Sequence, residues 1–392
     1  MKKLAVVSAL LVTMLGFSQT PQDSTQVAQL QQNAAQRILN GNINTGVTVG
    51  GYAQIDYNQP EADNGKLDVH RMVLLFGYKF NDKVQFITEV ELEHVSEVYV
   101  EQAFLNYSLT DNVNLRGGLM LVPMGIVNEY HEPTTYFGVE RPNVDKYIVP
   151  STWREIGIGV SGKFDNASLR YQAYIFNGFK SVESDGDGNI TGAFLGGKKG
   201  LRSGRQKGAE STINTPNFAA KLDYYGITGL RLGLSGYFGK TQSPDDVNDV
   251  DGADVGISMV GFDARYAYKK FLARGQFIYA GLSGSDDYNT QNSTDLGAAL
   301  QGWYVEGAYN LLPATKEQKL YASVRYEDYD THAKVEDGLT RNDSYHRKEW
   351  TFGLNYKLAQ GAVFKTDYQI FDTAAEGTDA KGQFNMGIGV WF

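Results

Sequence analysis

The sequence has no cysteine and only 9 prolines among its 392 residues. Without cysteine the chain can form no disulfide bond and no thiolate metal site, and it cannot carry a lipidated amino-terminal cysteine. Long apolar runs are missing as well. The run at 4–15 is too short to span a bilayer as a helix. A mean hydropathy of −0.35 excludes a helical membrane protein but allows a barrel whose inward residues are polar.

Glycine and tyrosine are abundant instead, with 44 and 25 copies. A tyrosine ring suits the boundary between lipid and water, because its hydroxyl stays hydrated while the ring lies in apolar surroundings. Together with the few prolines, this composition favours one large β structure over two or three soluble domains. The formal net charge of −9 gives no indication of a nucleic-acid partner.

The segment 383–392, QFNMGIGVWF, has the two-residue period of a strand. One face would carry large apolar side chains and a terminal aromatic ring, and the other would carry Gln383, Asn385 and two glycines. Such a strand fits between lipid and a wet lumen. It resembles the last strand of bacterial outer-membrane proteins, which commonly ends in phenylalanine. We therefore expect a barrel in the outer membrane of a Gram-negative bacterium.

The same alternation recurs from residue 47 onward and predicts an all-β fold, a single-chain 16-stranded antiparallel transmembrane β-barrel. Short turns would join the strands at one end and longer connections at the other, as in outer-membrane barrels. Within 98–109 the carboxylate of Glu101 falls on the lipid-facing side, so we expect a β-bulge or a bilayer-edge position there. The predicted strands are 47–57, 69–80, 84–94, 98–109, 113–121, 154–164, 167–177, 217–225, 229–239, 257–269, 271–281, 301–310, 319–328, 347–358, 361–372 and 383–392.

Three regions follow along the chain. Residues 1–18 read as a secretory signal peptide, because two lysines precede the apolar run and small residues end it. Residues 19–46 form a polar periplasmic lead-in, either flexible or a short trimerising helix, although three apolar positions cannot sustain a stable coiled coil. Residues 47–392 form the transmembrane β-barrel.

Charged residues of both signs alternate onto the inward face of the predicted strands. Sixteen tilted strands leave a lumen wide enough for water, so these charges would tune ion selectivity. Alternatively, they only solvate the wall and stiffen it with salt bridges. The predicted pore-lining cations are Arg71, Lys79, Arg116, Arg170, Lys221, Arg231, Arg265, Arg274 and Arg325. The predicted pore-lining acids are Glu89, Glu91, Glu93, Asp263, Glu306 and Glu327, with Asp223 and Asp367 on the same face.

The connection 122–153 is expected to be an inward-folded third loop that narrows the pore. Its four prolines prevent pairing as a strand throughout, and its apolar residues are too numerous for a freely solvated loop. An ordinary folded surface loop or a trimer contact would also explain this composition. The charged residues of the predicted constriction, acidic on balance, are Glu129, Glu132, Glu140, Arg141, Asp145 and Lys146.

A basic patch stands apart in the connection 178–216. It could collect anions at the extracellular mouth or bind lipopolysaccharide phosphates, and a solvated loop is the alternative. The patch consists of Lys198, Lys199, Arg202, Arg205 and Lys207.

Signatures of metal sites and enzymes are nearly absent. The stretch 185–189 is similar to the start of a calcium loop, but Ile190 stands where that loop needs glycine and Gly196 where it needs an acid. There is no G-x-S-x-G, no H-E-x-x-H and no phosphate-binding Gly-Lys loop. We expect no enzyme, no cofactor and no metal, although scattered histidines leave open a catalytic site assembled in space at the barrel rim.

The run at 116–125, the acid Glu129 and the run at 151–162 together resemble the phosphate-selective porin O and P family. In that family a strand ends in a Gly-rich segment bounded by proline, a long loop follows, and the next strand opens with an Arg–acid–apolar–Gly sequence. The stretch at 101–105 is similar to its Glu-x-Ala-aromatic strand. The resemblance implies a sixteen-stranded trimeric channel with an inward third loop, and phosphate binding by arginines and lysines of the wall and loops.

Because the inward charges nearly cancel, we expect an outer-membrane porin that passes small hydrophilic solutes and ions with general or weak selectivity. A phosphate- or polyphosphate-selective anion channel is one alternative. A surface-binding barrel without transport, contacting a partner through the loops 178–216 and 282–300, is another. The expected partners are outer-membrane lipid, lipopolysaccharide and two further copies in a homotrimer.

Overall fold

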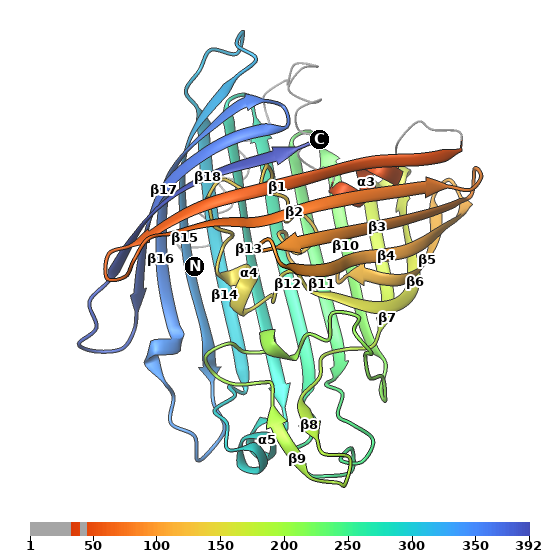
Figure 1. Ribbon diagram of the computed structural model, residues 1–392, viewed down its shortest axis with the longest axis vertical. Coiled ribbons are helices and arrows are strands. Elements are labelled where there is room, and N and C mark those ends of the chain that lie inside the picture. The colour runs from red at the N-terminus through yellow and green to blue at the C-terminus, as the bar shows by residue number, and fades with distance from the viewer. Residues whose placement is uncertain (1–32, 40–44) are drawn as a thin grey trace, which may run out of the picture.

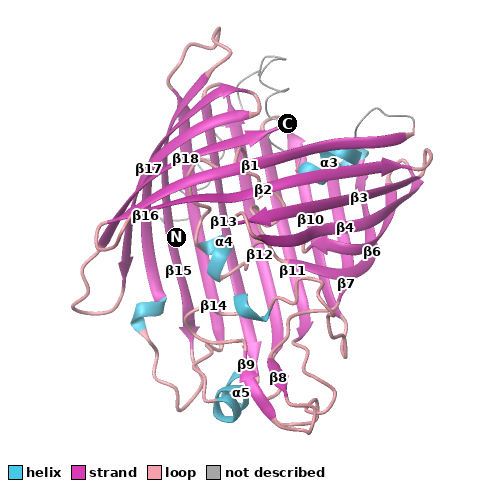
Figure 2. Ribbon diagram, viewed as in Figure 1, coloured by secondary structure: helices cyan, strands magenta, loops and turns pink. Residues whose placement is uncertain are grey.

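Sixteen β-strands form one closed antiparallel barrel (Figures 1 and 2). The computed structural model describes residues 33–39 and 45–392, so the predicted signal peptide at 1–18 lies outside the described residues. Neighbours in the sequence are neighbours in the ring, and β1 (Gly46–Pro60) pairs with β18 (Lys381–Trp391) to close it. The prediction of a 16-stranded antiparallel barrel is confirmed.

Every barrel strand overlaps a predicted one. The largest difference is at β15, which continues beyond 328 because its end is buried against the connection 177–216, where the Thr331 hydroxyl donates to the Gly197 carbonyl. The remaining barrel strands are β2 (Lys66–Lys79), β3 (Val84–Glu93), β4 (Glu97–Thr110), β5 (Val113–Leu121), β6 (Arg154–Phe164), β7 (Leu169–Phe176), β10 (Asn217–Ile227), β11 (Leu230–Lys240), β12 (Gly256–Tyr268), β13 (Phe271–Ser283), β14 (Ala299–Asn310), β15 (Lys319–Lys334), β16 (His346–Ala359) and β17 (Ala362–Thr373).

Side-chain exposure alternates along the strands with a period of two. In β18 the side chains of Phe384, Met386 and Ile388 are exposed, whereas Asn385 between them is fully buried. Large exposed apolar side chains recur on strand after strand, so the barrel has an apolar outer face and a polar inner face. This pattern fixes the register, because a slip of one residue would turn every polar side chain of a strand outward.

The conflict predicted at Glu101 is resolved by a bulge. In the β3–β4 ladder Glu89 pairs with Gln102 and Val90 pairs with Val100, which leaves Glu101 as the extra residue. Its side chain is fully buried rather than turned to lipid. The bulge therefore keeps a carboxylate on the polar face of a strand whose other residues alternate normally.

The seam between β1 and β18 uses the aromatic end of the chain. The Gly51 amide donates to the Phe392 carbonyl at 3.0 Å, and the Phe392 amide donates back to the Gly51 carbonyl at 2.9 Å. The rings of Tyr52 and Trp391 stack with centroids 5.9 Å apart. The segment 383–392, predicted from the sequence to be the last strand, thus closes the barrel.

The two ends of the barrel differ. Turns such as 269–270 and 360–361 define a short-turn end, and connections such as 122–153 and 177–216 define a long-loop end, which lies at the bottom of Figure 1. The connections hold the hairpin β8 (Val182–Ser184) and β9 (Ile190–Ala193), the helices α4 (Val144–Tyr147) and α5 (Ser285–Asn292), and the 3₁₀ turns η1 (Asp165–Ala167), η2 (Arg202–Gly204) and η3 (Asp343–Tyr345). Within the described residues, no helix combines the length and apolarity needed to cross a bilayer.

Part of the predicted lead-in is a helix docked on the barrel. Helix α3 (Ala34–Leu39) contacts β2 and β3. Ile38 lies against Gly77, where a Cβ atom would come within 2.2 Å of the Ile38 side chain. The Arg37 guanidinium lies 4.3 Å from the centre of the Trp391 ring. These residues therefore belong to the short-turn end of the barrel, whereas the rest of 19–44 lies outside the described residues.

Candidate functional site

The charges predicted for the pore wall lie on the polar face of the strands, and none of them is exposed. Most of the cations form ion pairs. Arg231 pairs with Asp223 at 2.7 Å. Arg325 pairs with Glu327 at 2.8 Å and with Glu306 at 3.3 Å. The same holds for Arg274 with Glu306, Lys221 with Glu129 and Asp263, Arg265 with Asp223 and Asp263, and Lys79 with Asp82.

Three predicted wall cations bind neutral groups instead. Arg71 donates to the Gln54 side chain and to the backbone carbonyl of His131. Arg116 donates to the Asn106 amide oxygen at 2.9 Å. Arg170 donates to Gln36 of helix α3 at 3.3 Å. The wall as a whole is a neutralised ion-pair network with a few hydrogen-bonded arginines.

The connection 122–153 packs against the polar face of strands from several parts of the barrel. Its backbone amides at Ile126 and Val144 donate to Gln276 on β13 and to Glu327 on β15. The Lys365 ammonium on β17 donates to two carbonyls of the connection, those of Tyr136 and Gly138, each at 2.8 Å. A loop free in solvent would not satisfy its backbone with buried wall side chains.

The base of this connection is closed by Asn128, which the sequence did not single out. Its side-chain amide donates to the carbonyls of Val122 and Trp153, and its oxygen accepts from the Trp153 amide at 2.7 Å. The buried Trp153 ring stacks on Phe179 and packs at a tilt against Tyr237, each with centroids 4.6 Å apart. The Asn128 amide therefore holds the two ends of the loop together, and the Trp153 ring packs the second end against residues outside the loop.

A second anchor is a buried cluster around His131. Its Nε2 lies 3.0 Å from the Glu101 carboxylate, 3.6 Å from Glu89 and 2.9 Å from the Tyr52 hydroxyl. Burial lowers the pKa of His131, but the Glu101 and Glu89 carboxylates outweigh burial and raise it well above its usual value. The possible ligand atoms of Glu89, Glu101 and His131 lie within 4.8 Å of one another, close enough to hold a metal ion. A protonated imidazole, however, forms an ion pair rather than a metal bond.

The charged residues of the predicted constriction have unequal partners. The acids are engaged: Glu129 pairs with Lys221, Glu140 accepts from Asn58, Asp145 accepts from Gln276, and Glu132 is buried. Burial raises the pKa of Asp145, which favours its neutral form. Arg141 and Lys146 instead line a large cavity. The excess of acids counted in the sequence is therefore compensated by hydrogen bonds and an ion pair in the structure.

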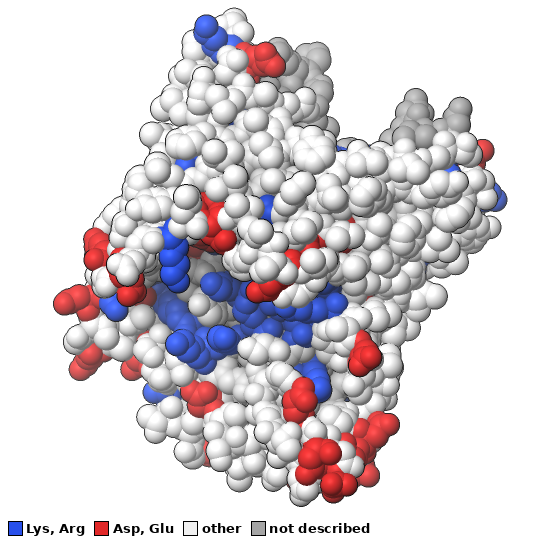
Figure 3. Space-filling model, in the orientation of Figure 1, with Lys and Arg blue, Asp and Glu red and all other residues white. Residues whose placement is uncertain are grey.

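That cavity, the outer cavity, opens at the long-loop end and contains about 2300 Å³ of space, part of it open solvent. In Figure 3 lysine and arginine side chains gather in the hollow, and carboxylates border it. Apart from the exposed Lys66, six lining lysines and arginines form no ion pair with a carboxylate in the described part of the chain. These outer cations are Arg141, Lys146, Arg202, Arg205, Lys207 and Arg347.

The outer cations other than Arg141 contact carbonyls or aromatic rings. Arg202 and Arg205 both donate to the Ser151 carbonyl, at 2.6 and 2.9 Å. Arg347 lies over the ring of Tyr147 at 4.7 Å, and Lys207 lies over Tyr99 at 4.6 Å. Burial and the like charges of neighbouring arginines lower the pKa of Arg205. The cluster is thus a concentration of positive charge.

The cluster differs in membership from the basic patch predicted from the sequence. Arg202, Arg205 and Lys207 line the outer cavity, whereas Lys198 and Lys199 are exposed and do not. Arg347 joins from the start of β16, and no local pattern in the sequence indicated it. Carboxylates line the same cavity, which keeps the excess of positive charge modest: Asp63, Glu91, Glu93, Glu140, Glu349 and Asp372.

Residues 47–371 match the family model described as "Phosphate-selective porin O and P". A protein of Aquifex aeolicus (strain VF5) whose description is "Uncharacterized protein" is 33% identical over 343 residues, which are 83% of this chain and 76% of that protein.

Several solved outer-membrane proteins share the fold. The anion-selective porin from Comamonas acidovorans aligns with a TM-score of 0.58 and 11% identity, over 89% of this chain and 100% of that one. The outer membrane channel DcaP of Acinetobacter baumannii gives 0.56 and 13%, over 90% and 99%. The trimer form of OmpT from Vibrio cholerae gives 0.54 and 14%, over 89% and 100%. At these identities the likeness shows the barrel fold alone.

Proposed function

The chain belongs to the phosphate-selective porin O and P family and is an outer-membrane channel for passive diffusion in a Gram-negative bacterium. On that premise, we propose that it passes small hydrophilic solutes with a weak preference for anions. The observation that carries this preference is the contrast between paired wall charges and unpaired outer cations. Fixed charges in a water-filled pore with low-dielectric walls set the local ion concentrations. Paired charges add little to that field.

We further propose that 122–153 folds inward as the constriction. Its backbone is bonded to side chains of β13, β15 and β17, and Asn128 ties its two ends together. With long loops outside and short turns in the periplasm, the outer cavity is the extracellular entrance to this constriction. Deleting 126–148 should raise the single-channel conductance, and an unchanged conductance would contradict the assignment.

Reversal potentials in planar bilayers test the anion preference. With a KCl gradient across the membrane, we expect chloride to permeate faster than potassium through the wild-type channel. Replacing Arg202 and Lys207 by glutamine should move the ratio toward potassium. Replacing Lys198 and Lys199 by glutamine is the matched control, because these lysines lie in the same connection but outside the cavity. An equal ratio of chloride to potassium permeability in the two variants would contradict the role assigned to the outer cations.

The second candidate is a phosphate- or polyphosphate-selective channel. It is favoured by Arg202 and Arg205, whose guanidinium groups converge on one carbonyl near Arg154 and could bind an oxyanion between them. Millimolar phosphate should then block the chloride current. A chloride current that is insensitive to phosphate would contradict phosphate selectivity and favour the general channel.

The assembly is proposed to be a homotrimer, since one solved relative by fold is described as a trimer form. Cross-linking and mass measurement of the detergent-solubilised protein would test this. The family and fold indicate a channel rather than an enzyme, and we propose that the barrel carries no catalytic site and no bound metal. We also propose that residues 1–18 are removed on export, which amino-terminal sequencing of the mature protein would test.

A further inference from the structure

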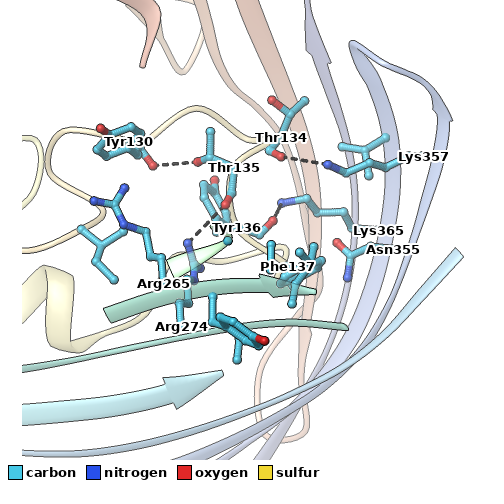
Figure 4. Close-up of a pocket in the computed structure, with 17 residues that line it drawn as sticks. Tyr130, Thr134, Thr135, Tyr136, Phe137, Arg265, Arg274, Asn355, Lys357 and Lys365 are labelled. Atoms are coloured by element: carbon cyan, nitrogen blue, oxygen red, sulfur yellow. Dashed lines mark hydrogen bonds between the residues drawn. The ribbon is translucent and has the colours of Figure 1, made fainter. Parts of the chain in front are cut away.

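A second cavity, the inner cavity, lies behind the connection 122–153 (Figure 4). Counted as space for the centres of water molecules, its volume is about 70 Å³, which leaves room for several waters or one small organic molecule. Gly229 and Ala267, beside short turns, line it, so it faces the short-turn end. Tyr136 lines both this cavity and the outer cavity, which makes the segment around Tyr136 the partition between them.

Two lysines on neighbouring strands, Lys357 and Lys365, reach this cavity without an ion pair in the described residues. The Lys357 ammonium on β16 donates to the Thr134 carbonyl at 3.5 Å, and the Lys365 ammonium on β17 donates to the carbonyls of Tyr136 and Gly138. Neither lysine forms an ion pair within the described residues. Figure 4 shows both side chains directed from the barrel wall toward the loop segment. A carbonyl satisfies the hydrogen bond of an ammonium but does not cancel its charge.

Two arginines face the same cavity from the opposite wall. The three guanidinium nitrogens of Arg265 are buried and make no hydrogen bond, and its nearest carboxylate oxygens, on Asp223 and Asp263, are 3.6 Å away. Arg274 pairs with Glu306, yet its second terminal nitrogen has no partner. Buried donors without partners are rare in proteins, and here they lie where an acceptor could enter.

The rest of the lining is largely aromatic and aliphatic. Carbon-rich side chains of the loop face similar ones of β13 and β17 across the cavity. An inorganic anion such as phosphate would lose hydration there without polar replacement on most sides. An apolar body would gain by burial, and an aromatic ring can pair with other rings. The apolar lining includes Ile126, Tyr130, Phe137, Leu272 and Val363.

We propose that the inner cavity is a binding site for small organic anions, with a carboxylate on an aromatic or branched aliphatic body. The carboxylate faces Lys357 and Lys365, and the body lies against Phe137 and Leu272. This deepens the proposed function, on which it rests, by naming a solute class that the channel retains on the periplasmic side of its constriction.

Block of chloride current through the full-length protein in planar bilayers tests the site. Benzoate, orthophosphate and benzyl alcohol are added in turn at equal concentration. We expect benzoate to block at the lowest concentration, because only benzoate offers both the charge and the apolar ring. Phosphate that blocks as well as benzoate, or benzyl alcohol that blocks as well, would overturn the proposal.

Two variants locate the block. Lys357→Gln should raise the half-blocking benzoate concentration about tenfold, as expected for loss of one charged hydrogen bond. The control Lys348→Gln, an exposed lysine of the same strand outside the cavity, should leave it unchanged. Phe137→Ala should weaken block by benzoate but not block by acetate. This variant still tests the site if Lys357→Gln fails to assemble. A benzoate block that neither variant changes would overturn the proposal, whereas absence of any chloride current would overturn the channel itself.

Discussion

The barrel wall and the outer cavity contain the same kinds of charged residue but use them differently. On the wall, Arg231 and Arg325 lie within 3 Å of a carboxylate. In the outer cavity, Arg202 and Arg205 meet backbone carbonyls instead, and no acid pairs with them in the described part of the chain. A paired charge stiffens a wall, and an unpaired one creates a field that reaches passing ions. Partners, rather than residue counts, therefore decide what a charge in this lumen does.

The largest expected effect comes from making the wall resemble the outer cavity. Glu306→Gln leaves the buried charge of Arg274 uncompensated, because Glu306 is its ion-pair partner, whereas Arg325 keeps its pair with Glu327. We expect unfolding in lipid vesicles to become easier by about 3–5 kcal/mol, the usual result of removing one partner of a buried pair. The exposed pair of Glu336 with Lys334 is the control, and Glu336→Gln should cost less than about 0.5 kcal/mol.

The second largest effect is expected from a change of pH, which acts on the His131 anchor of the loop 122–153 rather than on the outer cations. The pKa of folded His131 is raised, mainly because its acid neighbours outweigh burial. The stabilisation is therefore complete below the unfolded pKa of about 6.5 and is lost as the pH rises through the folded value. Current fluctuations of the open channel should increase at alkaline pH as the loop anchor loosens. His131→Gln should remove this dependence, and a variant that keeps it would show that another group titrates.

A smaller effect is expected from salt. The outer cations face solution, so their field should be screened as the Debye length falls from about 10 Å at 0.1 M to about 3 Å at 1 M. The ratio of chloride to potassium permeability should then approach one in concentrated KCl. A ratio that stays constant over this range would mean that a narrow, desolvated site sets the selectivity.

The smallest effect comes from giving the outer cavity an acid of its own. Lys207→Glu places a carboxylate near Arg205 and Arg202, which now lack one. We expect the chloride preference to fall about twofold, because a single charge acts through water there. Stability should stay the same, since Lys207 forms no ion pair in the described residues. A loss of stability instead would indicate that Lys207 supports the loop through its contact with the Tyr99 ring.

The strands could be predicted because a period of two is a local property of the sequence. Even the misfit of Glu101 was visible, since a carboxylate on a lipid-facing row requires a bulge. The outer cations could be predicted only in part, because the backbone path decides that Arg202 faces the cavity while Lys199 faces solvent. The place of Arg347 and the inner cavity depends on contacts between segments far apart in the sequence, and no local pattern encodes such contacts.

The seam between β1 and β18 has a consequence for biogenesis. These strands are the first and last of the ring along the sequence, so this edge of β1 has no partner strand within the chain until β18 has arrived. Until then the sheet carries two open edges, which lipid cannot satisfy and which invite pairing with other chains. Release of the finished barrel into the membrane must therefore wait for the synthesis and delivery of its final strand, and any nascent chain cut before Lys381 should depend on chaperones or be degraded.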